Sequence, residues 1–248
     1  MKAMCDSAFL GVSLSNGAFK RMFASNLYAW LLQNGVSAIE IVVFDRIEVI
    51  NYEVFRTMQP DVALTRTKAR GRDLANMFER VDRDAGLCRK VTLESEHYLL
   101  TTAQYKEIHG ELVSEYYGCA KFAKAVRWQV VNNLAQRVQR YGYEYVAENM
   151  ERLSRYILGE LTFFQVYAET YSRTLEVYPG PNLRIKEQLL ACDFPGLRRF
   201  ARVRNSWFYR DLGTLVSQRV ERRLPVHSRP RVASSTPRAP TTAVALSL

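Results

Sequence analysis

The segment FLGVSLSNGAF, Phe9 to Phe19, carries hydroxyl groups at a point where a nucleophile would be accessible. Ser13 follows the apolar run 8–12, which predicts a buried strand, and an amphipathic helical pattern starts soon afterwards. A strand, a tight turn and a helix would place Ser13 at the carboxyl end of the strand, where open α/β sheets bind ligands. Two interpretations stay open: Ser13 is a nucleophile, or one of Ser13, Ser15 and Asn16 simply caps the helix.

A second group of chemically useful residues lies far along the chain. Tyr156 and Glu160 are four positions apart in a helical pattern, so a phenol and a carboxylate share one helix face. Such a pair can converge on one small cation. Tyr178 follows in the sequence Glu-Val-Tyr-Pro, directly before Pro179. Each of these features is commonplace alone, and only their combination is informative.

Several common site types do not fit the serine turn. The turn has neither the G-x-G-x-x-G pattern nor the Walker lysine, which argues against nicotinamide and ATP sites. A nucleophile elbow would need glycine where this chain has Ser15. No motif surrounds the three histidines, His97, His109 and His227. A Ser-His-Asp hydrolase is therefore disfavoured.

The elements that would position these residues alternate between strands and helices. A nearly all-apolar second strand over 37–45 forms a βαβ unit with the first strand and the helix that begins near Ala18, and its crossover should be right-handed. Further patterns predict a basic helix over 62–84, a turn and short strand over 86–92, helical stretches over 102–164, a short run at 175–178, and a helix with room for one more strand up to about 224. We expect an α/β fold with a parallel sheet core flanked by helices.

Length and composition favour one globular domain, residues 1–224, followed by a disordered Pro/Ser/Thr/Arg-rich tail, residues 225–248. No apolar run approaches the ~20 residues of a membrane span, and the first residues do not resemble a signal peptide, so we expect a cytoplasmic protein. The four cysteines have no paired spacing that suits zinc, and we expect them to be reduced and mostly structural: Cys5, Cys88, Cys119 and Cys192.

The formal charge of +10, from 35 Lys and Arg against 25 Asp and Glu, favours an anionic partner, with nucleic acid as the leading candidate. The most useful basic cluster falls largely on the predicted helix 62–84: Arg66, Lys68, Arg70, Arg72, Arg80, Arg83, Arg89 and Lys90. Taken alone, this cluster is more typical of a solvated helix face than of a binding surface.

The conjunction of these motifs resembles the cyclodipeptide synthases, which are tRNA-dependent enzymes. The resemblance runs from about Ala8 to about Pro181. It rests on G-x-S-x-x-N at Gly11, Ser13 and Asn16, the Tyr156/Glu160 pair, Tyr178 before Pro179, and Tyr105, which looks like the family's additional active-site tyrosine. It implies a single Rossmann-like domain, similar to the catalytic domain of class I aminoacyl-tRNA synthetases.

The resemblance implies that two aminoacyl-tRNAs are joined into a cyclic dipeptide by a ping-pong mechanism. Ser13 would attack the first aminoacyl ester, so that no ATP, metal or other cofactor is required. Glu160 and Tyr156 would hold the α-ammonium group, and Tyr178 would relay a proton when the ring closes. No histidine of these motifs can activate Ser13. The resemblance offers the hydroxyl or phosphate region of the leaving tRNA as the proton acceptor, and the base stays open.

The resemblance also implies binding residues. Gly11, Asn16 and Tyr105 would contact the substrate, and a first amino-acid pocket would be lined by Phe9, Val42 and Phe163. Transfer RNA would lie on Arg66, Lys68, Arg70 and Arg72, with Arg198, Arg199, Arg202 and Arg204 as the alternative group.

The chain departs from the family pattern at two positions, since Ser7 and Thr162 stand where the family usually has histidine and proline. Asn16 together with Pro179 leaves its branch of the family open. We expect a monomer without membrane contact. The alternatives are a non-catalytic tRNA- or RNA-binding protein with the same fold and, less favoured, a serine hydrolase.

Overall fold

A five-stranded parallel sheet forms the centre of the computed structural model, which describes residues 7–36, 38–85, 90–171 and 173–216. The strands are β1 (Ser7–Ser13), β2 (Ala38–Phe44), β3 (Lys90–Ser95), β4 (Thr174–Tyr178) and β5 (Trp207–Asp211). Their order is β3-β2-β1-β4-β5 and every neighbouring pair is parallel. This arrangement confirms the predicted Rossmann-like α/β fold and shows that the further strand exists.

The chain changes direction across the sheet between β1 and β4. It builds outward from β1 to β2 and β3, and then returns to the other side of β1 for β4 and β5. In the register, Ser13 lies opposite Phe44 of β2, and Phe9 lies opposite Glu176 of β4. Open α/β sheets bind ligands at the carboxyl ends of strands where the order reverses. Here that point is the end of β1 and β4, which carry Ser13 and Tyr178.

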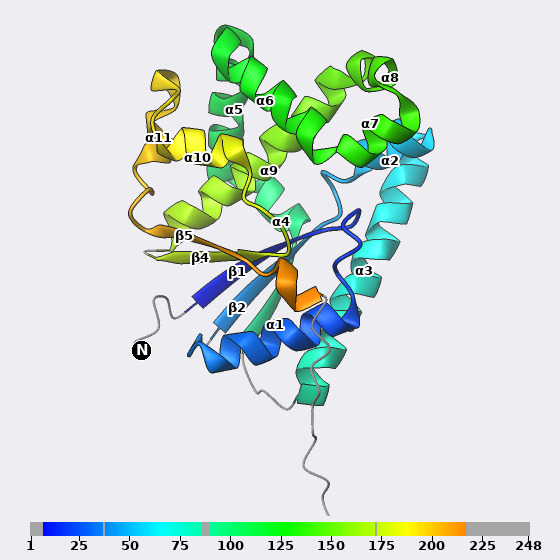
Figure 1. Ribbon diagram of the computed structural model, residues 1–248, viewed down its shortest axis with the longest axis vertical. Coiled ribbons are helices and arrows are strands. Elements are labelled where there is room, and N and C mark those ends of the chain that lie inside the picture. The colour runs from blue at the N-terminus through cyan, green and yellow to red at the C-terminus, as the bar shows by residue number, and fades with distance from the viewer. Residues whose placement is uncertain (1–6, 37, 86–89, 172, 217–248) are drawn as a thin grey trace, which may run out of the picture. The chain divides into compact units, whose positions relative to one another are not determined.

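Helices cover both faces of the sheet (Figure 1). On one face lie α1 (Arg21–Gln33) and α3 (Pro60–Ala85), which pack against Leu10 and Val12. The other face is covered by α4 (Glu96–Thr101), α5 (Ala103–Gly118), α6 (Ala120–Asn133), α9 (Met150–Thr170) and α10 (Arg184–Leu190). Successive strand residues alternate between these two cores, since side chains along a strand point to opposite faces. Phe9, Val42 and Phe44 therefore join the second core.

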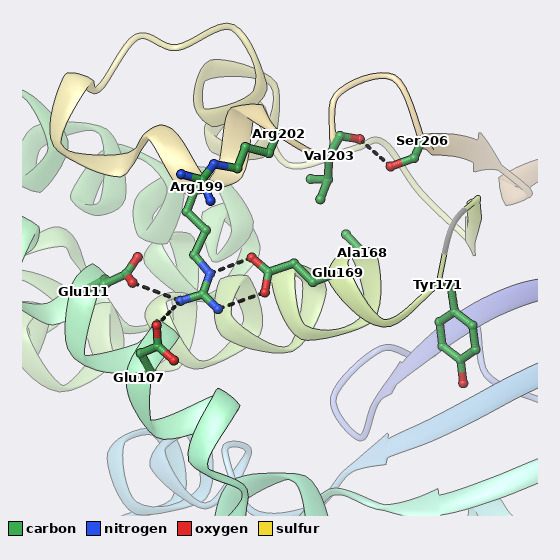
Figure 2. A pocket seen from close by; sticks show the side chains of 9 residues that line it. All are labelled: Glu107, Glu111, Ala168, Glu169, Tyr171, Arg199, Arg202, Val203 and Ser206. Carbon is green, nitrogen blue, oxygen red and sulfur yellow. Dashed lines mark hydrogen bonds and ion pairs between the residues drawn. The ribbon is translucent and has the colours of Figure 1, made fainter.

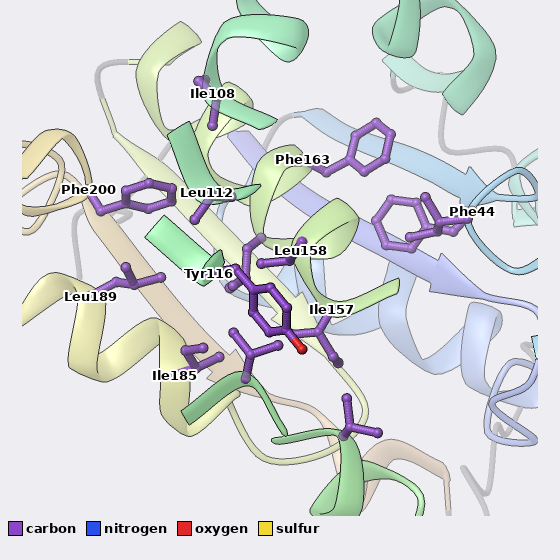
Figure 3. Packing of buried hydrophobic residues seen from close by; sticks show 14 of the residues in the cluster. Phe44, Ile108, Leu112, Tyr116, Ile157, Leu158, Phe163, Ile185, Leu189 and Phe200 are labelled. Atoms are coloured by element: carbon purple, nitrogen blue, oxygen red, sulfur yellow. The ribbon is translucent and has the colours of Figure 1, made fainter. Parts of the chain in front are cut away.

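The long helix α9 is fixed on several sides within this second core. Its residues Ile157 and Leu158 pack among Leu112, Ile185 and their neighbours (Figure 3). The hydroxyl of Thr162 donates to the carbonyl of Leu158 at 2.7 Å, which satisfies a buried polar group inside the helix. Because α9 also carries Tyr156 and Glu160, this packing limits how far those two side chains can move.

Three short helices surround the carboxyl edge of the sheet. They are α2 (Val49–Arg56), which follows β2 closely, and the pair α7 (Ala135–Tyr141) and α8 (Tyr143–Glu148). The helical stretch expected over 102–164 is thus divided into α5 to α9. One break falls at Gly142, whose φ of 87° is readily adopted only by glycine, and another at Cys119, whose backbone is extended.

The remaining described elements are the short helix α11 (Arg198–Ala201) and two 3₁₀ turns, η1 (Pro195–Leu197) and η2 (Gly213–Val216). Of the cysteines, Cys119 is half-buried and Cys192 exposed, and both are free thiols; Cys5 and Cys88 lie outside the described residues. The tail predicted over 225–248 and the domain limit at 224 also lie outside them. Among the helices described, none has the length and apolar character to cross a membrane.

Candidate functional site

The serine turn after β1 does not cap the following helix. Helix α1 begins at Arg21, and its N-cap residue Lys20 makes no side-chain capping bond. The amide oxygen of Asn16 instead accepts from the backbone N–H of Ala18 at 2.9 Å, which closes the turn. The capping interpretation is therefore wrong for this helix. Ser13 is only 6% exposed, and its hydroxyl donates a hydrogen bond to the side chain of Glu48.

Glu48 is a functional candidate that the sequence interpretation missed. It is completely buried at the N-cap of α2, and one of its carboxylate oxygens accepts from both Ser13 and the hydroxyl of Ser15, the latter at 3.0 Å. Asn51 donates to the other oxygen at 3.0 Å. A signal was present, because Glu48 follows the carboxyl end of β2, the strand next to β1, where ligand sites of such sheets lie.

Tyr178 ends the neighbouring strand β4. Its phenol oxygen accepts a hydrogen bond from the side-chain amide of Asn16 at 3.1 Å, and its ring packs edge-on against Phe19. Burial, followed by the nearby charge of Glu160, raises the pKa of the Tyr178 phenol well above its ordinary value. Tyr178 is thus a neutral hydrogen-bonding group at neutral pH.

Tyr156 and Glu160 of α9 line the same cavity as Ser13 and Tyr178. Burial raises the pKa of Glu160 to about 7; Lys186 opposes this rise, while the charges of Glu176 and Glu48 add to it. The Tyr156 phenol lies 3.5 Å from a carboxylate oxygen of Glu48, and burial raises its pKa. Within the described residues Glu160 has no salt bridge, so this carboxyl group can receive a cation from a ligand.

A buried ion pair forms another wall of the cavity. The ammonium group of Lys186 lies 2.6 Å from a carboxylate oxygen of Glu176, and the two side chains are 5% and 7% exposed. Because the ammonium group of Lys186 is paired with Glu176, it does not form a salt bridge with Glu160. The carboxyl group of Glu160 is therefore available to the ammonium group of a ligand.

The cavity that these residues share has a volume of about 600 Å³. Its wall opposite the strand ends comes from the α6–α7 junction, including Asn133, Gln136 and Arg137, and its rim from the turn after β4, residues 179–183. Most of the residues that line it carry polar groups, although polar and apolar atoms contribute similar shares of its surface. Ser13, Tyr156, Glu160 and Tyr178 come from three separated parts of the chain, and the fold brings all four to this one cavity.

The residues expected to line a first amino-acid pocket lie elsewhere. Phe9 stacks on Tyr167, with ring centroids 4.2 Å apart, and Phe163 packs against Phe44 and Tyr105. Together with Val42 they belong to the packed core, and the cavity lining does not include them. Gly11 is needed here for packing, because a Cβ at this position would stand 2.7 Å from a ring carbon of Phe44.

The basic residues of α3 lie outside the cavity. Arg66, Arg70 and Arg72 are exposed, and Lys68 is half-buried. The buried stripe of α3 runs through Thr67, Gly71 and Leu74. At 100° per residue, Arg66 and Arg70 lie on one side of this stripe, and Lys68 and Arg72 on the other. The described structure therefore presents two separate basic edges.

Arg199, in the alternative basic group, is occupied by intramolecular contacts. Its guanidinium group forms ion pairs with Glu107, Glu111 and Glu169, at 2.7, 2.9 and 2.5 Å, which join α11 to α5 and α9 (Figure 2). An arginine held by three carboxylates is not available to RNA phosphates. Arg198, Arg202 and Arg204 are exposed.

Several solved structures with a similar fold are cyclodipeptide synthases. A protein from Mycobacterium tuberculosis is 19% identical with a TM-score of 0.65, covering 84% of this chain and 85% of that one; its structure was described as relating cyclodipeptide synthetases to type I tRNA synthetases. A synthase from Fluoribacter dumoffii is 14% identical with a TM-score of 0.67, covering 82% and 87%. AlbC from Streptomyces noursei is 17% identical with a TM-score of 0.60, covering 85% and 97%.

Comparison with curated proteins gives no match. The family model for cyclodipeptide synthase, in contrast, matches residues 3–178. This range includes Ser13, Tyr156, Glu160 and Tyr178. Because the match covers more than half of the sequence, this chain belongs to the cyclodipeptide synthase family.

Proposed function

We propose that this protein joins two aminoacyl groups, each delivered by an aminoacyl-tRNA, into a cyclic dipeptide through esters on Ser13. The observation that carries the proposal is the convergence of Ser13, Tyr156, Glu160 and Tyr178 on one cavity at the strand-order reversal. A hydroxyl, a carboxyl group without an internal cation and two neutral phenols are the groups that such a reaction uses.

In the first step the hydroxyl oxygen of Ser13 attacks the ester carbon of one aminoacyl-tRNA. The aminoacyl group moves to Ser13, and the tRNA leaves with its free ribose hydroxyl. Because the tRNA ester is already activated, the step requires neither ATP nor another cofactor. The position of Ser13 at the end of β1, facing the cavity, supports this role.

The α-ammonium group of the bound aminoacyl ester would lie against Glu160, with Tyr156 beside it. A charge-assisted hydrogen bond of this kind contributes about 1.5–3 kcal/mol when shielded from water. With a pKa raised to about 7 by burial, Glu160 can hold the ammonium and then accept its proton near neutral pH. The amine so released is the nucleophile for the second step.

In the second step this amine attacks the ester carbon of a second aminoacyl-tRNA. A peptide bond forms, the second tRNA leaves with its free ribose hydroxyl, which takes the proton that the amine loses, and a dipeptidyl ester remains on Ser13. The terminal amine of the dipeptide then attacks the Ser13 ester, the ring closes, and the serine hydroxyl is regenerated. Tyr178 is the proposed proton relay for ring closure, and its phenol oxygen accepts a hydrogen bond from the side-chain amide of Asn16.

Transfer RNA would be held through its phosphates by one of the two basic edges of α3, which are Arg66 with Arg70 and Lys68 with Arg72. The exposure of the arginines supports this, as does the overall charge of +10. We propose that the protein acts as a monomer in the cytoplasm, where aminoacyl-tRNAs are made and used.

Product analysis tests the proposed function directly. The purified protein is incubated with the aminoacyl-tRNAs of a total tRNA pool, and cyclic dipeptides are sought by mass spectrometry. A cyclic dipeptide that is absent without protein or without charging supports the proposal. Tight binding of aminoacyl-tRNA with no product would favour a non-catalytic RNA-binding protein, and release of free amino acids from simple esters would favour a hydrolase.

A further inference from the structure

We infer that Glu48 is the general base that takes the proton from Ser13 as the serine attacks the first aminoacyl-tRNA. This inference rests on the proposed function and names the group that activates its nucleophile. Serine hydroxyls are weak nucleophiles unless a neighbouring base removes the proton. The family resemblance leaves the base open, with the hydroxyl or phosphate of the leaving tRNA as the alternative. In the described structure a carboxylate oxygen of Glu48 accepts a hydrogen bond from the Ser13 hydroxyl.

The contact geometry carries the inference. The hydroxyl of Ser13 donates to one carboxylate oxygen of Glu48, so the proton already points at its acceptor. No described histidine competes for this role: His109 of α5 stacks on Tyr105 with centroids 5.7 Å apart, and neither it nor His97 lines the cavity. Among the described residues Glu48 is the acidic side chain in hydrogen-bond contact with Ser13.

The surroundings of Glu48 hold its carboxylate in one orientation. The oxygen that receives Ser13 also accepts from the hydroxyl of Ser15 at 3.0 Å, and the phenol of Tyr156 approaches it at 3.5 Å. Asn51 holds the other oxygen at 3.0 Å. Donated hydrogen bonds offset the cost of burying a carboxylate, and a helix N-terminus favours negative charge.

The segment that carries Glu48 is itself fixed by a second buried acid. The carboxylate of Glu96, at the start of α4, accepts from the backbone N–H groups of Arg46 and Ile47 at 2.6 and 2.9 Å. Glu96 is completely buried. This clamp sets the path of the chain between β2 and α2, and with it the position of Glu48 relative to Ser13.

The proton balance of the step is complete without another reactant. The Ser13 O–H bond breaks and its proton passes to Glu48, while the serine oxygen forms a bond to the ester carbon. When the bond from that carbon to the tRNA ribose oxygen breaks, Glu48 gives the proton to the departing oxygen. The carboxylate is restored, and the tRNA leaves as an alcohol.

Single-turnover loading of Ser13 with one purified aminoacyl-tRNA, followed by intact-protein mass spectrometry, measures this step. Glu48→Gln keeps the shape and removes the base, so loading should slow by roughly 10²–10⁴-fold. Binding of the aminoacyl-tRNA should change by less than about threefold, since Glu48 is buried beneath the cavity. Glu53→Gln is the matched control, because Glu53 lies on α2 and pairs with Arg152 outside the cavity; its loading rate should stay within twofold.

Replacing the nucleophile by a thiol, in Ser13→Cys, distinguishes a chemical role of Glu48 from a structural one. Thiols ionise near pH 8.5 without a base, so at pH 8.5 Glu48→Gln should cost less than about tenfold in a Ser13→Cys background. If Glu48 only holds the turn in place, the loss will be equally large with serine and with cysteine, and the inference is overturned. Should Glu48→Gln not fold, Glu48→Asp allows the same comparison, because a retracted carboxylate should slow the serine enzyme far more than the cysteine enzyme.

The wild-type protein distinguishes failure of this inference from failure of the proposed function. If wild-type protein acquires no aminoacyl group, both are overturned. If it does, and Glu48→Gln loads at the wild-type rate, only the role of Glu48 is overturned and the covalent route through Ser13 stands.

Discussion

The side-chain amide of Asn16 donates a hydrogen bond to the phenol oxygen of Tyr178, with the nitrogen and oxygen 3.1 Å apart. This contact ties the turn after β1 to the end of β4, where the strand order of the sheet reverses. Because the phenol oxygen is the acceptor, the hydrogen of Tyr178 stays available for a second partner. The oxygen of the same amide accepts from the backbone N–H of Ala18 in the serine turn. The Ser13 hydroxyl is held separately by Glu48, whereas Asn16 contacts the Tyr178 phenol directly.

Asn16→Ala should therefore impair ring closure more than loading. A neutral hydrogen bond contributes about 1 kcal/mol, which corresponds to roughly a fivefold lower rate of cyclisation. In a quenched time course, dipeptidyl-enzyme should accumulate in this variant. Asn34→Ala removes an exposed amide at the end of α1, whose partner is the carbonyl of Trp30, and should leave both steps unchanged. Equal slowing of both steps in Asn16→Ala would contradict the proposed relay.

Glu160 should make the stability of the free protein depend on pH. Burial raises its pKa from 4.5 to about 7, so between these values the native protein holds a proton that the unfolded chain has lost. The stabilisation is thus complete below about pH 4.5 and is lost as the pH rises through 7. The unfolding free energy of the wild-type protein should therefore fall between pH 5 and pH 8, and in Glu160→Gln this fall should be smaller by about 1–2 kcal/mol. The difference is less than the full pKa shift implies, because Glu160 faces the cavity. Urea unfolding at the two pH values measures the difference, and an unchanged pH dependence would rule out this burial effect.

The buried pair of Lys186 and Glu176 should be costly to break and cheaper to replace. Lys186→Met leaves Glu176 buried without its cation and should destabilise the protein by roughly 3–5 kcal/mol. Adding Glu176→Gln to Lys186→Met should restore much of this loss, because a neutral amide then replaces the unpaired charge. Thermal unfolding of both variants gives the comparison. A double variant no more stable than Lys186→Met would show that the two residues do not act as a pair.

The two basic edges of α3 can be tested separately. Replacing Arg66 and Arg70 by Ala, or Lys68 and Arg72 by Ala, removes two charges from one edge. Removing the edge that contacts tRNA should make the slope of log affinity against log salt less steep, by roughly 0.7–0.9 for each lost phosphate contact. Turnover at high tRNA concentration should largely recover, because these side chains lie outside the cavity. Unchanged salt slopes for both double variants would show that tRNA is held elsewhere, and Arg198, Arg202 and Arg204 would be tested next.

The strand β1 and the serine turn could be predicted because an apolar run that ends in small polar residues is a local signal, and β2 because it is nearly all apolar. The pattern placed β3 less well, since the strand expected within 86–92 is Lys90–Ser95. The α/β fold followed from the alternation of such runs with helical patterns. The contact between Ser13 and Glu48 could not be predicted, because 35 positions separate the two residues. It depends on the pairing of β1 with β2 and on the Glu96 contacts that set the chain between β2 and α2. In the sequence, only its place after the second predicted strand distinguishes Glu48 from other acidic residues.

The surroundings of other residues could not be predicted for similar reasons. The pattern marks Phe9 and Phe163 as apolar, but whether an apolar side chain lines a cavity or fills a core depends on its neighbours; here Tyr167 and Phe44 occupy the adjacent space. Likewise, composition counts Arg199 as a free positive charge. The structure surrounds it with carboxylates from helices that are distant in the sequence.

A covalent aminoacyl group on Ser13 is the central claim, and mass spectrometry of the protein after rapid mixing with aminoacyl-tRNA tests it most directly. The wild-type protein should gain the mass of one aminoacyl group, which peptide mapping should locate at Ser13. Ser13→Ala should gain no mass and form no cyclic dipeptide while it still binds tRNA, whereas Ser15→Ala, which alters the neighbouring hydroxyl, should retain the adduct. An adduct at another residue, or cyclic dipeptide from Ser13→Ala at more than a few per cent of the wild-type rate, would contradict the mechanism.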